Sequence, residues 1–311
     1  MPVRVPSVSR VPVWVWRTLM AHVGPRELRR FNAQPIDSVE YSLDIDYVGD
    51  GHRGHRLDVI SPRASAGPLP VYVYFHGGGW TSGDKAALTR YCATQAASGM
   101  VVVNVNYRRA PRYRMADMIE DANAALSWIA ASVADFGGDP DRVVLGGDSA
   151  GGQLSALMAA TTTRPELAEH YGIRPALQRI RGVVQHCGAL DFSVMFERGF
   201  ILSTGFIRML LPIGHDRSQL RDLARYLSPI EWVGADYPPV LVTTSRPDPF
   251  YRASLNFVDA LRSHRVPVDV HVDEDAQHTW QQDSHHPRSA PVYERLQDFV
   301  ARVASGRAIH A

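Results

Sequence analysis

The sequence predicts an α/β fold, in which a mostly parallel central sheet has helices on both faces. Three observations support this prediction. Short runs of β-prone apolar residues alternate along the chain with longer helical segments, as in repeated β-α-β units. Several of these runs are continuously apolar, which is typical of parallel strands buried on both faces. The first two strands are instead separated by a short turn at residues 49–51, which predicts an antiparallel hairpin at one edge.

The predicted elements follow one another along the chain. The edge hairpin joins strands at residues 39–48 and 55–60. Further strands are expected at 71–75, 100–106, 143–145, 182–186, 239–244 and 268–272, and helices at 115–133, at about 149–160 and at 290–303. Residues 192–233 interrupt this alternation with many apolar residues between two strands. They predict helices that form either an extra core layer or a cover over one edge of the sheet.

The N-terminal residues stand apart from the alternation. Apolar residues from 13 to 31 predict an amphipathic helix that is broken near Gly24 and Pro25 and packs against the body. The alternative is a helix at a membrane surface, a role favoured by two tryptophans and several arginines. Pro12 and Arg17 interrupt the apolar stretch, which therefore differs from a signal peptide, and no stretch is long enough to span a bilayer. We expect a cytoplasmic protein without an integral membrane segment.

Composition limits the classes of partner and cofactor. The 311 residues are 45% hydrophobic and 21% charged, which provides apolar material for one large core. A formal net charge of +1, with no basic run, argues against a nucleic-acid partner. Cys92 and Cys187 are the only cysteines. They lack the spacing of a metal site, so we expect two buried free thiols.

The strongest chemical signal is the motif Gly147-Asp148-Ser149-Ala150-Gly151, which directly follows the strand at 143–145. Small residues on both sides of a serine allow a strand to turn sharply into a helix and present the hydroxyl at the corner. This pattern predicts Ser149 as a nucleophile, with Asp148 bracing the turn. Alone, the motif is equally consistent with an ordinary glycine-rich turn, so its weight depends on the rest of the chain.

A second motif, His76-Gly77-Gly78-Gly79-Trp80, follows the strand at 71–75. A serine that attacks a carbonyl creates an oxyanion, which needs N–H donors aimed at it before the reaction starts. Gly78 and Gly79 are the favoured donors, with Gly77 as an alternative, and the N–H of Ala150 completes the hole. Three glycines alone would indicate only a flexible turn. Together with the serine motif, they predict an acyl-transfer site.

A nucleophilic serine requires a base, and the base requires an orienting carboxylate. Asp248 lies in the loop after the strand at 239–244, and His278 in the loop after the strand at 268–272. Both loops are expected at the edge where parallel strands end, which is the edge that binds ligands in such sheets. We therefore predict Asp248 as the acid and His278 as the base. The alternatives are Asp236 and Asp273 for the acid, and His271, His285 and His286 for the base.

These motifs resemble those of the hormone-sensitive-lipase family of α/β-hydrolases. Besides the two glycine motifs, the resemblance includes Asn106-Tyr107-Arg108 and Phe136-Gly137-Gly138-Asp139-Pro140. It covers about residues 40–300 in element order and is strongest from 72 to 160. It implies a carboxylic-ester hydrolase that needs no cofactor or metal, with Ser149, Asp248 and His278 as the catalytic triad.

The resemblance also implies the organisation of the chain. We expect a single α/β-hydrolase domain over residues 1–311, with cap elements at about 1–38 and 192–233 that line an acyl pocket. Trp80 is expected in the wall of this pocket, and a core aromatic is the alternative. The expected substrate is a small-molecule ester or lipid of short to medium acyl chain, and the expected assembly is a monomer or homodimer.

Three alternative functions remain open. A formamidase of the kynurenine-formamidase type has a similar oxyanion loop, although the residues around Ser149 favour an esterase. Plant gibberellin receptors resemble this fold without the catalytic histidine, so a ligand-binding role is the second alternative. The third is a lipase that contacts a membrane or droplet surface through the N-terminal helix.

Overall fold

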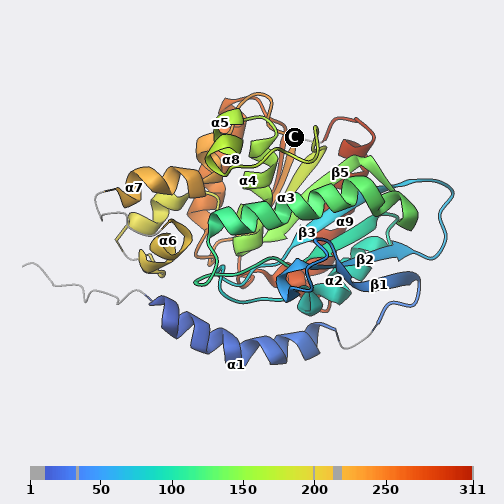
Figure 1. Cartoon of the computed structure of the whole chain (residues 1–311), viewed down its shortest axis with the longest axis horizontal. Coiled ribbons are helices and arrows are strands. Elements are labelled where there is room, and N and C mark those ends of the chain that lie inside the picture. Colours follow the sequence, from blue (N-terminus) through green and yellow to red (C-terminus); the bar gives the residue numbers. More distant parts are fainter. Residues whose placement is uncertain (1–10, 33–34, 199, 213–218, 310–311) are drawn as a thin grey trace, which may run out of the picture.

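The computed structural model describes residues 11–32, 35–198, 200–212 and 219–309. At its centre is a sheet with helices packed around it (Figure 1). The sheet has eight strands in the order β1-β2-β4-β3-β5-β6-β7-β8. The strands are β1 (Val39–Asp46), β2 (Arg56–Pro62), β3 (Leu69–Phe75), β4 (Val101–Val105), β5 (Gly138–Asp148), β6 (Gly182–His186), β7 (Val240–Ser245) and β8 (Val268–Asp273). The α-helices are α1 (Val13–Phe31), α2 (Thr89–Ala96), α3 (Met115–Ser132), α4 (Ser149–Thr161), α5 (Pro165–His170), α6 (Gly205–Leu210), α7 (Leu220–Leu223), α8 (Tyr251–Ser263) and α9 (Ser289–Ala304).

The sheet is parallel except at one edge. β1 and β2 pair antiparallel, and β2 also runs antiparallel to β4, whereas the strands from β3 to β8 are mutually parallel. Tyr74 pairs with Gly146, and Phe75 pairs with Gly147. The loops that leave β3 and β5 therefore start side by side. This register brings the two glycine motifs together.

The side chains of β3 alternate between two apolar cores, as expected for a strand. Val71, Val73 and Phe75 belong to a core that includes residues of α3, α4 and α8. Tyr72 and Tyr74 belong to a second core, with residues of α2 and α9. Both faces of the sheet are thus covered by helices, which explains why the central strands are apolar throughout. The predicted α/β fold is confirmed.

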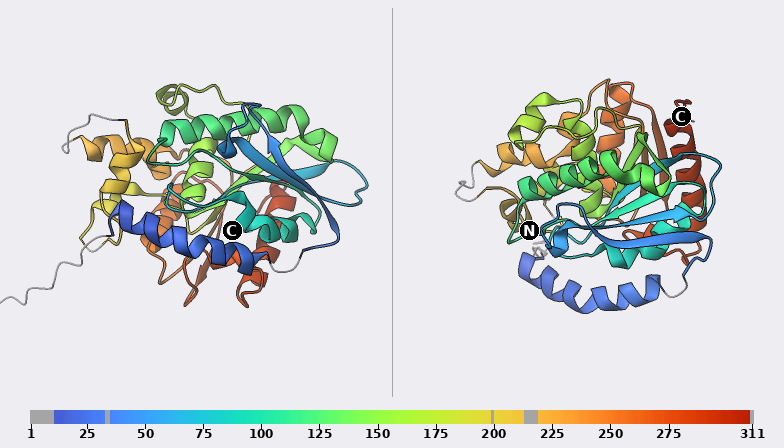
Figure 2. Two further views of the ribbon diagram at one scale, coloured as in Figure 1. Left: turned by 60° about the horizontal axis from the view of Figure 1, so that its bottom comes forward. Right: turned by 45° about the vertical axis from the view of Figure 1, so that its right-hand side comes forward.

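Helix α1 runs without interruption from Val13 to Phe31 and lies along one side of the body (Figures 1 and 2). The predicted break near Gly24 and Pro25 is therefore wrong. A proline restricts the backbone of the residue before it partly through that residue's Cβ. Gly24 has no Cβ, so its backbone is freer to remain helical. None of the helices in the described ranges is long and apolar enough to cross a membrane.

Residues 192–233 form short helices between β6 and β7. These are η4 (Phe192–Phe196), α6, α7, η5 (Ala224–Leu227) and η6 (Pro229–Trp232), while residues 199 and 213–218 lie outside the described ranges. The backbone just before α1 joins this segment, because Val11 N donates to Ile201 O at 2.8 Å and Ser203 N donates to Val11 O at 3.2 Å. The two segments predicted as cap elements are thus in direct contact.

Candidate active site

Ser149 stands where β5 ends and α4 begins. Its φ is +50°, in the left-handed region that a serine rarely adopts. A Cβ on Gly151 would lie 2.0 Å from Phe75 O, and a Cβ on Gly147 would lie 2.5 Å from the carbonyl carbon of Gly151. Only glycine fits at these two positions without moving the backbone. The sharp strand-to-helix turn expected from the motif is present, and it presents the Ser149 hydroxyl at the end of the sheet.

His278 and Asp248 lie beside Ser149. His278 Nε2 is 3.0 Å from Ser149 Oγ, and His278 Nδ1 is 2.6 Å from Asp248 Oδ2. Asp248 follows β7 and His278 follows β8, which are neighbouring strands in the sheet. A carboxylate only accepts hydrogen bonds, so the proton of the neutral ring lies on Nδ1. His278 Nε2 is then free to accept the proton of the Ser149 hydroxyl.

The carboxylate of Asp248 is held by the backbone that follows it. Its side chain is 0% exposed. Phe250 N donates to Asp248 Oδ1 at 2.6 Å, and Tyr251 N donates to Asp248 O at 3.0 Å. The first bond occupies Oδ1 and leaves Oδ2 directed at His278, while the second is to the backbone carbonyl of Asp248. Because the donors are backbone groups, they do not depend on the identity of the side chains at 250 and 251.

The alternative acids and bases are engaged elsewhere or lie away from Ser149. Asp236 pairs with Arg164 at 2.7 Å, and Asp273 pairs with Arg288 at 2.9 Å. His285 is exposed in the loop before α9. The remaining alternatives are His271, which lies within β8 with its ring centroid 6.4 Å from that of Trp280, and His286, whose Nδ1 accepts from Arg288 N at 3.2 Å.

The loop after β3 contains the three predicted oxyanion glycines. Gly78 has a φ of +121° and Gly79 a φ of +59°, both of which favour glycine. Gly77 N donates to Asp148 Oδ1 at 3.0 Å and is therefore occupied. Within the described ranges, Gly78 and Gly79 donate their N–H groups to no protein acceptor. Ala150 lies in the first turn of α4, where an N–H has no acceptor within the helix.

The hydrogen bonds of the glycine loop reduce the number of N–H groups that are candidates for the oxyanion hole. The geometry leaves Gly78, Gly79 and Ala150 with N–H groups that could bind an oxyanion. Gly77, the alternative donor in the motif, is better suited to a structural role, because its N–H binds Asp148. The motif alone cannot distinguish the three glycines, since the distinction depends on a carboxylate from a different strand.

The His76 ring supports this loop, a role that the sequence motif did not reveal. Its Nδ1 lies 2.7 Å from Gly77 O, and the ring stacks on Tyr107 with centroids 4.6 Å apart. Burial lowers the pKa of His76 to about 4, so the ring is neutral near pH 7. Because a carbonyl only accepts, Nδ1 carries the proton and donates to Gly77 O. The Tyr107 hydroxyl also donates to His76 O at 2.7 Å.

Asp148 lies buried beneath the serine and braces the same loop. Its Oδ1 accepts from the Tyr74 hydroxyl at 3.0 Å as well as from Gly77 N. Burial raises the pKa of Asp148 to about 6, although hydrogen bonds from Tyr74, Gln282 and Gly77 oppose this effect. The bracing role expected of Asp148 is thus visible in its contacts, which join the loop after β3 to the residue before Ser149.

Trp80 is a buried link between three parts of the molecule. Its side chain is 1% exposed. The indole N–H donates to Gln153 Oε1 at 2.6 Å, and the ring centroid lies 5.7 Å from that of Phe192 and 6.1 Å from that of Phe206. A side chain with so little exposed surface offers almost none to a substrate. The burial and contacts of Trp80 favour the alternative, a core aromatic between the glycine loop, α4 and the inserted segment.

Within the described ranges, one group of side chains has the spacing of a cation site. Potential ligand atoms of Cys187, Asp248 and His278 lie within 4.8 Å of one another. Burial, and then the charge of Asp248, raises the pKa of the Cys187 thiol well above its usual range. A protonated thiol is a poor ligand, and the other two groups already bind each other. The donors fit a support for Asp248 better than a metal site. Cys92 and Cys187 are free and buried, as expected.

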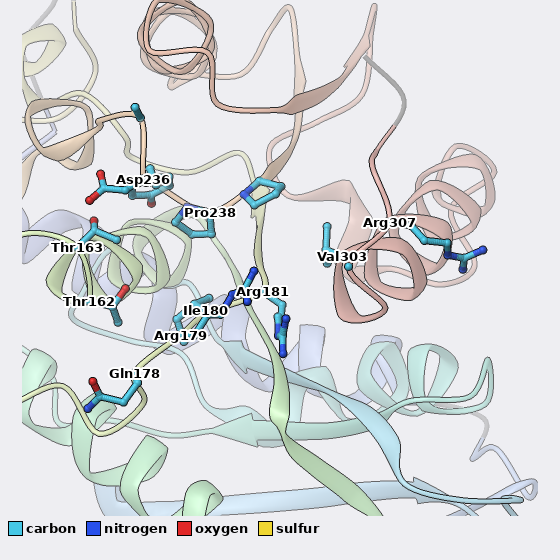
Figure 3. A pocket seen from close by; sticks show the side chains of 14 residues that line it. Thr162, Thr163, Gln178, Arg179, Ile180, Arg181, Asp236, Pro238, Val303 and Arg307 are labelled. Carbon is cyan, nitrogen blue, oxygen red and sulfur yellow. The ribbon is translucent and has the colours of Figure 1, made fainter.

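A hollow of about 420 Å³ lies where the parallel strands begin, at the opposite edge of the sheet from Ser149 (Figure 3). It is lined by residues that precede β6 and β7 and by residues at the ends of α4 and α9, among them Arg179, Arg181, Asp236 and Val303. The loops with Ser149, Asp248 and His278 leave the other ends of the strands. This hollow is therefore separate from the serine site.

The chain is similar to known hydrolases in sequence. A family model described as the alpha/beta hydrolase fold matches residues 72–282. NlhH, a carboxylesterase of Mycobacterium tuberculosis, is 30% identical over 260 residues, which cover 80% of this chain and 78% of NlhH. LipM of the same organism is 33% identical over 230 residues, which cover 70% of this chain. The chain spans about half of the length of LipM, since the match covers 51% of that protein.

The three-dimensional comparison agrees on the fold. The crystal structure of esterase B from Lactobacillus Rhamnosis superposes with a TM-score of 0.83 at 22% identity, and the match covers 94% of each chain. The family match begins within β3 and ends with the short helix Trp280–Gln282 that follows His278, so it includes both glycine motifs and all three loops of the site. The chain therefore belongs to the α/β-hydrolase fold family, as its motifs predicted.

Proposed function

We propose that this chain is a serine hydrolase that cleaves carboxylic esters of short to medium acyl chain. The observation that carries the proposal is the continuous hydrogen-bonded path from Asp248 through His278 to Ser149. The free N–H groups of Gly78 and Gly79 beside this path add the second requirement of acyl transfer. The similarity to NlhH, which is named a carboxylesterase, supports esters as the substrate class.

In the proposed mechanism, Ser149 Oγ attacks the ester carbonyl carbon while His278 Nε2 takes the hydroxyl proton. Asp248 keeps the ring oriented and stabilises its positive charge. The N–H groups of Gly78, Gly79 and Ala150 bind the oxyanion. The tetrahedral intermediate then releases the alcohol, which receives its proton from His278, and leaves the acyl group on Ser149. Water repeats these steps, with His278 as base, and releases the acid.

The proposal includes a cap over the serine site, formed by the N-terminal segment and the inserted residues 192–233. The backbone pairing of Val11 with residues 201–203 joins the start of α1 to the inserted segment, and the inserted residues Phe192 and Phe206 contact Trp80 beside the glycine loop. A cap in this position would select the acyl chain by the space that it leaves. We further propose that the substrate is a small-molecule ester or lipid. The protein is proposed to be a monomer or homodimer with a cytoplasmic location.

The test is the rate of hydrolysis of p-nitrophenyl esters from acetyl to palmitoyl, by the wild type and by Ser149→Ala. Loss of the nucleophile is expected to lower kcat by on the order of 10⁶-fold, as in other serine hydrolases. Ser127→Ala is the matched control, because Ser127 is exposed on α3 and its hydroxyl donates to Asn123 O of the same helix. It is expected to retain full activity.

The other functions give different results in the same assay. A peak at long acyl chains would indicate a lipase and would support a membrane-surface role for α1. Faster turnover of a formyl amide than of any ester would indicate a formamidase. Ester turnover by Ser149→Ala at the wild-type rate would contradict the proposed nucleophile, and no Ser149-dependent turnover of any substrate would favour a ligand-binding role.

A further inference from the structure

Trp16 of α1 lies directly against the glycine loop after β3. Its indole Nε1 donates to Gly78 O at 3.4 Å. A Cβ added to Gly79 would lie 2.5 Å from Trp16 Nε1 and 2.9 Å from Trp16 Cε2, so the indole is in contact with the backbone of Gly79. A side chain of the N-terminal segment thus touches the loop that supplies the proposed oxyanion donors.

The contact of Trp16 acts on the peptide group between Gly78 and Gly79, which can rotate more easily than most peptide groups. The carbonyl of Gly78 and the N–H of Gly79 belong to the same planar trans peptide, so they point in opposite directions. This peptide is flanked by glycines on both sides, and glycine permits backbone rotations that other residues resist. Whatever holds Gly78 O therefore determines where the Gly79 N–H points.

Two side chains hold Gly78 O. One is Trp16, and the other is Ser82, whose hydroxyl donates to Gly78 O at 2.6 Å. Two backbone N–H groups also donate to this oxygen, that of Ser82 at 3.1 Å and that of Thr81 at 3.3 Å. The Ser82 donors come from the glycine loop itself and follow any movement of that loop. Trp16 belongs to α1, so its N–H donor does not move with the glycine loop.

Trp16 is itself held in place. It packs against the larger of the two cores together with Val13, and its backbone N–H donates to Pro12 O at 3.2 Å. Val11, which precedes Pro12, is paired with residues 201–203 through backbone hydrogen bonds. The position of the indole therefore depends on both segments of the proposed cap.

We propose that Trp16 is a positioning residue that keeps the Gly79 N–H directed at the oxyanion. This inference rests on the proposed esterase function, and it gives α1 a part in the chemistry beyond covering the site. Removal of one oxyanion donor typically costs about 10²–10³-fold in kcat. Because Ser82 and the Thr81 N–H still hold the carbonyl, loss of the Trp16 N–H alone is expected to cost less, about tenfold.

The test compares Trp16→Phe with the wild type. Phenylalanine retains an aromatic ring but has no N–H donor. We expect kcat to fall about tenfold while KM changes little. We also expect the same factor in the rate of inactivation by a p-nitrophenyl alkylphosphonate, because its phosphoryl oxygen occupies the oxyanion position. Trp14→Phe is the matched control, since Trp14 lies on the same helix and is 71% exposed. It is expected to leave both rates unchanged.

A double variant distinguishes the loss of a hydrogen bond to Gly78 O from a general disturbance of the fold. Ser82→Ala removes the other side-chain donor to Gly78 O. If each donor can hold the carbonyl when the other is absent, the Trp16→Phe, Ser82→Ala double variant loses more activity than the product of the two single losses. Thermal unfolding of all variants provides the control for folding.

The outcomes are distinguishable from failure of the proposed function. If Ser149→Ala is inactive and Trp16→Phe retains the wild-type kcat and inactivation rate, the inference about Trp16 is overturned and the esterase proposal stands. A change in KM or chain-length preference alone would make Trp16 a pocket wall and would also overturn it. If Trp16→Phe fails to fold, 3-benzothienylalanine at position 16 removes the N–H at nearly constant volume and decides the question.

Discussion

The carboxylate of Asp148 accepts the backbone N–H of Gly77 at 3.0 Å and so ties the glycine loop after β3 to the residue before the nucleophile. The two residues are 71 positions apart in the chain. The same carboxylate oxygen accepts the Tyr74 hydroxyl at 3.0 Å. The loop and the serine turn are therefore held as one unit, and the buried carboxylate that joins them has consequences for stability.

Replacement of Asp148 by asparagine is expected to stabilise the protein above pH 6. Burial raises the pKa of Asp148 to about 6, so the folded state binds this proton more tightly than the unfolded chain does. The free energy of unfolding of the wild type therefore decreases as the pH rises from about 4 through about 6. Asparagine does not ionise, and its Oδ1 can accept both hydrogen bonds. We expect a gain on the order of 1–3 kcal/mol at pH 7.5.

Chemical denaturation between pH 4 and pH 8 measures this effect. The two proteins are expected to have similar stability near pH 4 and to diverge above it. Asp148→Ala is the matched variant, because it removes the charge and also leaves Tyr74 and Gly77 without their acceptor. It is expected to be less stable than Asp148→Asn at every pH. Parallel pH profiles for the wild type and Asp148→Asn would show that the carboxylate does not titrate in this range.

Asp248→Asn is expected to lower kcat by about 10³–10⁴-fold while the protein stays folded. The asparagine amide can donate to His278 Nδ1, which favours the tautomer whose proton lies on Nε2. That tautomer cannot accept the proton of Ser149. The measurement is kcat on a short-chain p-nitrophenyl ester across a pH series.

Asp236→Asn provides the control for Asp248→Asn. Asp236 was an alternative acid in the sequence, and it pairs with Arg164 at an exposed position. Such surface pairs contribute little to stability, so this variant is expected to keep both its fold and its activity. Large loss of activity in Asp236→Asn, with an active Asp248→Asn, would reverse the assignment of the acid.

Gly151→Ala is expected to cost at least about 3 kcal/mol of stability, because overpacking against a rigid backbone cannot be relieved by a side-chain movement. The added Cβ would lie 2.0 Å from Phe75 O, at the end of β3. Gly67→Ala is the control, since a Cβ at Gly67 would meet nothing within 4 Å. That variant is expected to change stability by less than about 1 kcal/mol. Equal unfolding midpoints for the two variants would contradict the close approach at Gly151.

The sequence was most informative about the centre of the molecule. Buried parallel strands are continuously apolar, and the loops after them contain Ser149, Asp248 and His278, so both the sheet and the meeting of these residues could be expected. The helix at 251–263 was not predicted, although buried Ala253, Phe257 and Leu261 recur at every fourth residue along it. A systematic search for helical periodicity would have found it.

Other features depend on contacts between distant parts of the chain and had no local signal. The continuity of α1 through Gly24 and Pro25 is one example. The contact of Trp16 with Gly78 depends on how α1 lies against the body, and the assignment of the Gly77 N–H depends on the direction of the Asp148 carboxylate. Trp80 was placed in a pocket wall because it follows the glycines, but its direction is determined by Gln153 and two phenylalanines.

The bridge between Val11 and Leu202 also sets an order of events on the ribosome. Residues 11–31 are synthesised well before the segment at 201–203 with which Val11 pairs. Until then, Val11, which lies two residues before α1, has no backbone partner, although domains usually begin to fold from the N-terminal side during synthesis. The segment that leads into α1 therefore cannot take its final position until residues 201–203 have been synthesised.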